Sequence, residues 1–350
     1  MSLLYLLGGR QRTLLFKHED EFRLYEAALI LRLDTVAGIA NLEVEYKSPP
    51  EARACEESSH IFKSATLVGN KFYTCTSTEV LIFEVPGFKR IGYVSLPAFN
   101  DLHHIAPALD GNLLVANTGL DMVVRVTPGG QVLERWNVLG EPPWSRFSPD
   151  VDYRKVESTK PHRSHPNAVF HLGEEIWVTR FSQRDAICLT SPGKSIRIEV
   201  QRPHDGLVRG NRIYFTTVDG RIVIADRGRL EVEQIIDLNE IHKVNNPGDD
   251  AVLGWCRGIL PVDERRVWVG FTRVRKTRFK ENVLWIKHAF REIERSTHIA
   301  LYDIAERKCL QEIDVEQYGL SVIFGIYNAE LVPNREEKDR PHAMERKQVV

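Results

Sequence analysis

Short segments in which hydrophobic and polar residues alternate occur along most of the chain. Val, Ile, Phe and Tyr recur at every second position in these segments, and turns rich in Gly, Asp and Asn separate them. A two-residue period is typical of half-buried β-strands, whereas an amphipathic helix places its apolar residues three or four positions apart. We therefore predict an all-β protein. The clearest strands are KFYTC (71–75), LLVAN (113–117), IWVTR (176–180), IYFTT (213–217) and VWVGF (267–271).

The order of these segments indicates an internal repeat. In each copy, a short apolar segment leads to a tight polar turn, then to one of the strands above, and then to one or two further alternating strands. The turns align at Gly69, Gly111, Gly173, Gly210 and Glu264, which are 42, 62, 37 and 54 residues apart. A repeat of about 40 residues with four short antiparallel strands is typical of a β-propeller blade.

Strands at both ends of the chain remain outside these five copies. We expect N-terminal strands within 3–45 and a C-terminal strand within 322–334 to form a sixth blade, because closure by both termini removes the open sheet edges. The prediction is thus a single propeller domain over 1–350 with six four-stranded blades, although five or seven blades also fit the spacing. The other blade cores are expected near 59–98, 103–138, 165–200, 204–238 and 256–315.

Two insertions explain the long intervals between turns. Residues 139–164 are Pro-rich and polar, which predicts a loop. Residues 273–296 are locally basic and are expected to be partly helical, with Trp285, Ile286 and Phe290 packing on a blade or on another subunit. This segment is therefore the expected contact of a homo-oligomer.

Composition narrows the classes of partner. The chain of 350 residues has 47 basic and 48 acidic side chains, so no overall field favours nucleic acid or a membrane surface. No apolar run approaches the 18 or so residues needed to span a bilayer. The five cysteines are odd in number and widely spaced, which favours a reducing cytoplasm over a disulfide framework. We expect a cytoplasmic protein with a small-molecule substrate.

Three short segments resemble known propeller families. LDGNLLVANTG (109–119) resembles the turn-and-strand segment of six-bladed propellers of the NHL-repeat and gluconolactonase (regucalcin-like) type. RPHDGL (202–207) resembles segments that carry metal ligands in gluconolactonase-like enzymes, and HPNAV (165–169) distantly resembles a segment of arylsulfotransferase-like propellers. These resemblances imply the propeller fold and a metal-dependent site, although the gluconolactonase family relies on carboxylate and amide ligands where this chain has mainly histidines.

Polar residues just before each innermost strand are expected to converge at one end of the central channel. Their metal-binding members would be His103, His104, His165, Asn167 and His204, since imidazole is the commonest ligand of Zn²⁺, Fe²⁺ and Mn²⁺. Strand alternation allows only one of His103 and His104 to face the axis, and the register shared with His165 favours His103. The competing interpretation is a water-filled polar channel without metal.

Four further residues are candidates for catalysis at the same end. Arg202 and Arg257 could orient a carboxylate or phosphate by paired hydrogen bonds, or form salt bridges between blades with acids such as Asp205. Cys256 could be a nucleophile activated by a nearby imidazole, or a buried inert thiol. Asp205 belongs to the segment that resembles a metal-ligand segment.

These observations lead to one functional expectation and two alternatives. The expectation is a metal-dependent enzyme, either hydrolase- or lactonase-like or oxidative, that acts on a small polar or anionic substrate at the mouth of the channel. The alternatives are a non-catalytic scaffold that binds a protein or peptide, and metal-free group transfer by a His base or nucleophile. The sequence contains no GxSxG, Walker, GxGxxG or HExxH motif to choose among them.

Overall fold

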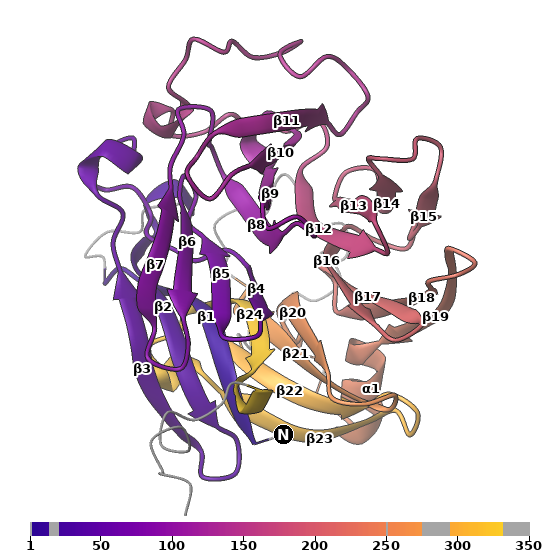
Figure 1. The fold of residues 1–350 in the computed structure, drawn as a ribbon. Coiled ribbons are helices and arrows are strands. Elements are labelled where there is room, and N and C mark those ends of the chain that lie inside the picture. The colour runs from indigo at the N-terminus through magenta and orange to yellow at the C-terminus, as the bar shows by residue number, and fades with distance from the viewer. Residues whose placement is uncertain (1, 14–20, 250, 275–294, 332–350) are drawn as a thin grey trace, which may run out of the picture.

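The fold is a six-bladed β-propeller, as the repeat pattern predicts (Figure 1). A computed structural model describes residues 2–13, 21–249, 251–274 and 295–331. Within them, six four-stranded antiparallel sheets follow one another around a central axis. We number these sheets as blades 1 to 6, each beginning with its innermost strand.

The strands divide among the blades as follows. Blade 1 contains β24 (Val322–Asn328), β1 (Leu3–Gln11), β2 (Tyr25–Asp34) and β3 (Ile39–Tyr46). Blade 2 contains β4 (Ala65–Val68), β5 (Lys71–Cys75), β6 (Val80–Glu84) and β7 (Lys89–Val94). Blade 3 contains β8 (Leu102–Pro107), β9 (Leu113–Asn117), β10 (Met122–Val126) and β11 (Val132–Asn137).

The other half of the ring has the same organisation. Blade 4 contains β12 (Pro166–Leu172), β13 (Glu175–Arg180), β14 (Asp185–Cys188) and β15 (Ser195–Arg197). Blade 5 contains β16 (Pro203–Arg209), β17 (Arg212–Thr217), β18 (Arg221–Asp226) and β19 (Glu231–Asp237). Blade 6 contains β20 (Trp255–Pro261), β21 (Arg266–Thr272), β22 (His298–Asp303) and β23 (Lys308–Asp314).

The two ends of the chain close the ring within blade 1. The C-terminal β24 pairs with β1 over a register that runs from Leu4 opposite Asn328 to Gly9 opposite Val322. Figure 1 shows the yellow β24 beside the indigo β1. Every blade therefore has neighbours on both sides, and the predicted closure by both termini is confirmed.

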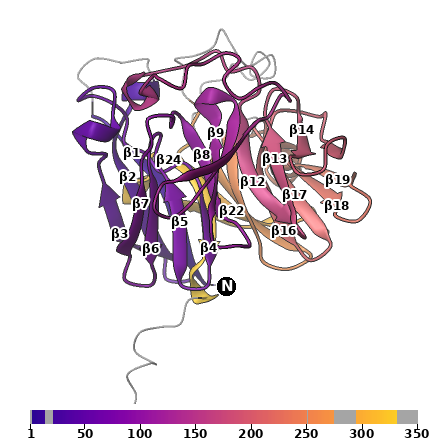
Figure 2. The ribbon, with the colours of Figure 1, turned by 45° about the horizontal axis from the view of Figure 1, so that its top comes forward.

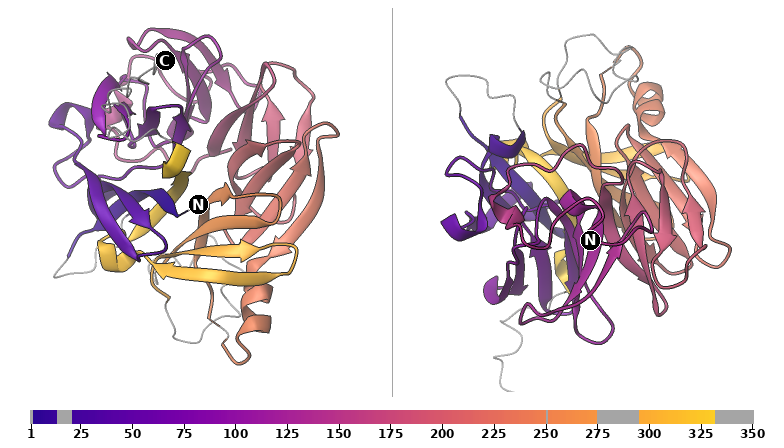
Figure 3. Two further views of the ribbon diagram at one scale, coloured as in Figure 1. Left: turned by 60° about the horizontal axis from the view of Figure 1, so that its bottom comes forward. Right: turned by 90° about the horizontal axis from the view of Figure 1, so that it is seen from above.

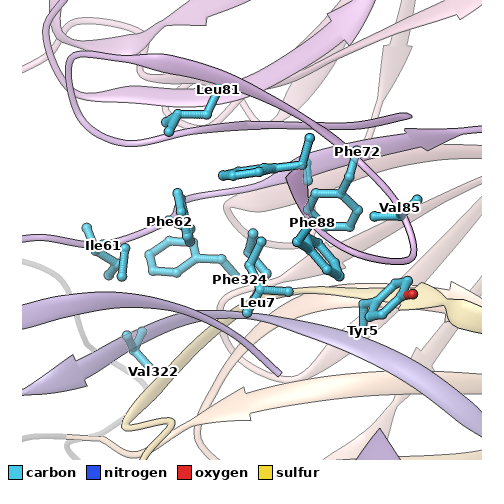
Figure 4. Packing of buried hydrophobic residues seen from close by; sticks show 14 of the residues in the cluster. Tyr5, Leu7, Ile61, Phe62, Phe72, Leu81, Val85, Phe88, Val322 and Phe324 are labelled. Carbon is cyan, nitrogen blue, oxygen red and sulfur yellow. The ribbon is translucent and has the colours of Figure 1, made fainter. Parts of the chain in front are cut away.

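Hydrophobic packing between blades explains why the ring is stable. Strands in the middle of a blade are buried on both faces, as in β9, whereas the outermost β23 alternates between exposed and half-buried residues. Between blades 1 and 2, aromatic rings meet edge to face: the ring centroid of Phe88 lies 5.0 Å from that of Tyr5 and 5.7 Å from that of Phe72 (Figure 4). Such pairs favour one packing arrangement in addition to burying apolar area.

Irregularities at one height interrupt five of the six inner strands. The pairing with the neighbouring strand shifts register at His103, at Asn167–Ala168, at Asp205–Gly206, at Arg257–Gly258 and at Phe324. A bulge leaves its residue outside the ladder and redirects the side chain. The repeated bulge therefore turns a set of side chains from five blades toward the start of the channel.

Segments outside the blades pack against the ring or lie at its outer edge. The 3₁₀ helix η4 (Tyr153–Lys155), inside the insertion 139–164, packs Tyr153 into the core of blade 3. The helix α1 (Leu238–Asn245) follows blade 5 and lies at the outer edge of the ring (Figure 3). Most of the predicted insertion 273–296 lies outside the described residues. No helix in the described part of the chain has the length and hydropathy needed to cross a bilayer.

The other 3₁₀ helices among the described residues are single turns at the ends of strands or in loops. They are η1 (Glu21–Arg23), η2 (Pro50–Ala52), η3 (Thr118–Leu120), η7 (Glu316–Tyr318) and η8 (Ala329–Leu331).

Candidate functional site

The six inner strands surround a channel of about 490 Å³. The inner strands β8, β12 and β16 follow one another around it (Figure 2). At the end where the inner strands begin, polar side chains from blades 2 to 6 lie next to one another. We call this group the polar mouth: Lys63, Asp101, His103, His162, His165, Asn167, His204 and Arg257.

His103 is held in a single tautomer. Its Nδ1 lies 2.8 Å from Oδ1 of Asn167, and Nδ2 of the same amide donates a hydrogen bond to the carbonyl oxygen of Pro203 at 2.8 Å. Because a carbonyl engages the amide nitrogen, Oδ1 faces the imidazole and must accept a hydrogen from Nδ1. Burial lowers the pKa of His103, so the ring is neutral and carries its lone pair on Nε2. A lone pair in this position can accept a proton or bind a metal ion.

Asp101 provides a buried carboxylate beside this lone pair. Its Oδ1 lies 3.4 Å from Nε2 of His103 and 3.2 Å from Nζ of Lys63, and the side chains of all three residues are less than a tenth exposed. Burial by itself would raise the pKa of Asp101, but the ammonium group of Lys63 holds it well below its usual range. The carboxylate is therefore ionised, and two acceptors, Oδ1 and the neutral Nε2, face each other.

Asp101 also meets two histidines from the loop before blade 4. Asp101, His162 and His165 each offer one ligand atom, and these three atoms lie within 4.8 Å of one another. Nδ1 of His162 lies 2.8 Å from Nδ1 of His165, and burial lowers the pKa of both imidazoles. Neutral imidazole is the form that coordinates metals. Two histidines and one carboxylate are a donor set that both Zn²⁺ and non-haem Fe²⁺ use.

Asp121 fixes the loop that carries these histidines. Its carboxylate accepts hydrogen bonds from the backbone N–H groups of Arg163, Ser164 and His165 at 2.8 to 2.9 Å. Asp121 itself is 1% exposed, and His165 has a φ of +61°, a conformation that non-glycine residues rarely adopt. These three bonds offset the backbone strain and hold both imidazoles beside Asp101.

His104 lines the channel together with His103, which corrects the expectation that only one of the two would face the axis. The bulge at His103 removes the strict alternation on which that expectation relied. The nitrogens of His104 have partners in both neighbouring blades: Nδ1 accepts from the N–H of Val169 at 3.3 Å, and Nε2 lies 3.4 Å from Oγ1 of Thr66. His104 therefore joins three blades, and its metal-binding role has no geometric support.

Neighbouring aromatic rings and two arginines complete the polar mouth and its rim. Phe181 lies between His165 and His204, with ring centroids 4.9 and 5.4 Å away, and the guanidinium carbon of Arg202 lies 5.3 Å from the centroid of Phe181. The corresponding carbon of Arg257 lies 4.6 Å from the centroid of Phe324. His204 is 6% exposed, and its Nε2 has no hydrogen-bond partner among the described residues. Burial, and next to it the charge of Arg257, keeps the pKa of His204 well below its usual value.

Asp205 lies on the channel wall, where it links blades 5 and 6. Its Oδ2 accepts hydrogen bonds from the hydroxyl of Thr216 and from the N–H of Gly258. Burial raises the pKa of its carboxyl to about 6. These contacts assign Asp205 to the wall of the channel, apart from the group Asp101, His162 and His165.

Cys256 lies in the core between blades 5 and 6. It is fully buried among apolar side chains that include Leu253, Phe271 and Tyr302. Burial raises the pKa of the thiol well above its usual value. Since the thiolate is the nucleophilic form, the expectation that Cys256 acts as a nucleophile is not supported, and the inert-thiol interpretation fits the geometry.

The structure thus brings His103, His165, Asn167, His204 and Arg257 together as predicted. Sequence reasoning missed Asp101, His162 and Lys63. Two spacings could have pointed to them: Asp101 stands two residues before His103, and His162 stands three before His165. His162 lies in the insertion 139–164, which was predicted only as a loop.

Comparisons with known proteins show the fold only. The chain matches no known family model, and no curated protein is detectably similar to it in sequence. A protein of unknown function from Bacteroides caccae has a similar structure, with a TM-score of 0.56 and 12% identity over 93% of this chain and 98% of the other.

Two further solved structures are less similar. One is virginiamycin B lyase from Staphylococcus aureus, with a TM-score of 0.42 and 16% identity over 69% of each chain. The other is the β-propeller domain of Cps50 (Swd1) from Myceliophteria thermophila, with a TM-score of 0.47 and 10% identity over 82% of each chain.

Proposed function

We propose that the protein is a metal-dependent enzyme whose reaction takes place at the polar mouth. The observation that carries the proposal is the group Asp101, His162 and His165, whose ligand atoms lie within 4.8 Å of one another. This group lies beside His103, which lines the 490 Å³ channel, is 3.4 Å from Asp101 and has its ring centroid 4.6 Å from that of His165. A convergent polar group at the mouth of an otherwise apolar cavity is the usual setting of an active site. This ligand set replaces the five residues expected from sequence and retains only His165.

The residues around this group suit chemistry on an anionic substrate. A divalent ion held there would polarise a substrate oxygen or lower the pKa of a bound water. His103 would accept or return a proton at Nε2, since Asn167 occupies its other nitrogen. Arg257, on the opposite side of the mouth, would orient an anionic group. The donor set is compatible with hydrolysis on Zn²⁺ and with oxidation on Fe²⁺, so metal identity separates the two reaction types.

Metal-free chemistry is the second candidate, and one observation favours it. Lys63 already supplies a cation to Asp101 at 3.2 Å, so the carboxylate is balanced without a metal ion. In that case His103, oriented by Asn167, would act as the general base in a group transfer or elimination.

Metal analysis of the purified protein distinguishes the two candidates. We expect stoichiometric Zn, Fe or Mn by inductively coupled plasma mass spectrometry. After removal by a chelator, titration calorimetry should show that one ion binds again. His162→Gln and His165→Gln should each weaken binding by at least tenfold. The matched control is His242→Gln, because His242 also pairs with a carboxylate, Asp249 at 2.8 Å, but lies on α1.

The outcomes separate the functional classes. Metal binding that His162→Gln and His165→Gln leave unchanged would reject this ligand set. A metal-free protein whose activity depends on His103 would support the second candidate. If neither metal nor any dependence on His103 appears, the non-catalytic scaffold becomes the better interpretation. We retain the proposal of a cytoplasmic location, since all five cysteines are free.

A further inference from the structure

Thr159 lies in the loop before blade 4, three positions before His162. Its hydroxyl oxygen Oγ1 is 2.5 Å from the carbonyl oxygen of Gly119, 3.2 Å from Oδ1 of Asn100 and 3.3 Å from Nε2 of His162. A hydroxyl group has one hydrogen to donate and two lone pairs with which to accept. The group that receives this hydrogen therefore decides whether His162 donates to Thr159 or accepts from it.

Two of the three contacts of Thr159 are with oxygens that can only accept. Gly119 contributes a backbone carbonyl. Asn100 presents Oδ1, because its Nδ2 donates to the carbonyl oxygens of Tyr153 and Val156 at 2.9 and 2.8 Å and so fixes the orientation of the amide. Two oxygens that are only 2.5 Å apart need a hydrogen between them, so the hydrogen of Thr159 points to Gly119.

The contact between Thr159 and His162 must then run in the opposite direction. Oγ1 of Thr159 has a lone pair but no second hydrogen, so Nε2 of His162 donates to it. Burial lowers the pKa of His162, so the ring is neutral and this N–H is the one that it carries. The lone pair of His162 is therefore on Nδ1, which lies 2.8 Å from Nδ1 of His165. In the metal-free protein, His165 is the donor in that short contact.

We infer that Thr159 is a positioning residue, which keeps the proton of His162 on Nε2 and leaves the lone pair of Nδ1 for a metal ion. A histidine ligand nearly always donates its other N–H to a neighbouring acceptor, which fixes its tautomer and ring orientation. Thr159 supplies this acceptor to His162, as Asn167 does to His103, and each acceptor in turn donates to a backbone carbonyl. The inference rests on the proposed function, because it concerns a ligand of the same site.

Nuclear magnetic resonance of the metal-free full chain with ¹⁵N-labelled histidine tests the tautomer directly. A ring nitrogen that carries hydrogen and one that carries a lone pair have well-separated ¹⁵N shifts. We expect hydrogen on Nε2 of His162 and on Nδ1 of His165, and His162→Gln assigns the signals. Thr159→Val retains the branched shape without the hydroxyl group, so the proton of His162 should move at least partly to Nδ1. Thr159→Ser retains the hydroxyl group and should keep the wild-type tautomer.

Titration calorimetry of the stripped protein with Zn²⁺ measures the effect on metal binding. Thr159→Val should weaken Zn²⁺ binding by about tenfold or more, since loss of a group that orients a histidine ligand costs about 10–100-fold in metal affinity. Thr159→Ser should bind Zn²⁺ about as tightly as the wild type. The matched control is Thr74→Val, because Thr74 on β5 also donates to a backbone carbonyl, that of Ser64 at 3.0 Å, and its loss should change neither measurement.

Three results would overturn the inference. They are hydrogen on Nδ1 of His162 in the wild-type protein, a Thr159→Val protein that keeps either the wild-type tautomer or the wild-type Zn²⁺ affinity, and an equal loss of affinity in Thr159→Ser. The first needs no variant, so a misfolded Thr159→Val protein would not obscure it. If the wild-type chain binds Zn²⁺ and Thr159→Val binds it equally well, only this inference fails. A wild-type chain that binds no Zn²⁺ would instead refute the proposed function, and the positioning role with it.

Discussion

Replacing Lys63 by Met should destabilise the protein strongly, because it removes the counter-charge of a buried carboxylate. Nζ of Lys63 lies 3.2 Å from Oδ1 of Asp101, and the two side chains are only 7% and 6% exposed. Breaking a buried pair by removing one partner costs about 3–5 kcal/mol, and loss of the stacking on Phe324 adds about 0.5–2 kcal/mol. Met retains the length and most of the apolar stem, so the cavity contribution is small.

Urea unfolding followed by circular dichroism and tryptophan fluorescence measures this cost. The protein should be stripped of metal, so that a bound ion cannot replace the lost ammonium. Lys194→Met is the matched control: Lys194 also pairs with a carboxylate, Glu175, but its side chain is half exposed, and its loss should leave the urea midpoint nearly unchanged.

A double-mutant cycle with Asp101→Asn tests the pairing itself. Each single change leaves one buried group without its partner, and the double change removes both charges. We expect the double variant to be more stable than the sum of the single losses predicts, by about 1–3 kcal/mol. Strict additivity, or a loss below about 1 kcal/mol for Lys63→Met, would refute the view that this pair is tightly coupled and dry.

Three further predictions concern the channel wall and the core. Burial raises the pKa of Asp205 from 3.8 to about 6, so the native state favours the protonated carboxyl group. The contribution of this group to the unfolding free energy is therefore fully present below about pH 4 and is lost as the pH rises through 6. In urea titrations, Asp205→Asn should reduce the fall in unfolding free energy between pH 4 and 7 by about 3 kcal/mol. Gly258→Ala should destabilise the protein more than Gly111→Ala in thermal melts, since both have positive φ but only at Gly258 would the added Cβ lie 3.0 Å from the backbone of Gly325. Native thiol labelling with Ellman's reagent should modify the half-exposed Cys55 well before Cys256, and rapid labelling of Cys256 would contradict its burial.

Much of the fold could be predicted because its signals are local. Alternation at 113–117 and 213–217 gives strands, and the recurrence of the Gly111-type turn gives the blade. The number of blades and the closure of β24 on β1 followed from unassigned strands at the two ends. The helix α1 was not predicted, because its eight residues carry too little periodic signal to separate them from a loop.

The candidate site was only partly predictable, for a geometric reason. Equivalent positions before the inner strands correctly indicated that His103, His165 and His204 converge, since blades repeat around one axis. The bulges, however, change which side chain faces the channel, and no alternation pattern reveals a one-residue shift.

The sequence by itself therefore determined the strands, the blades and the end of the ring where polar residues gather. Only the tertiary structure decided which of those residues meet. Asp101 and His162 precede different blades and are 61 positions apart, and Asp121 brings the second loop to the first through three backbone hydrogen bonds. His104 joins neighbouring blades, whereas His103 offers a lone pair. Contacts between blades decide which of these roles a histidine near a strand end takes, and no local sequence pattern encodes those contacts.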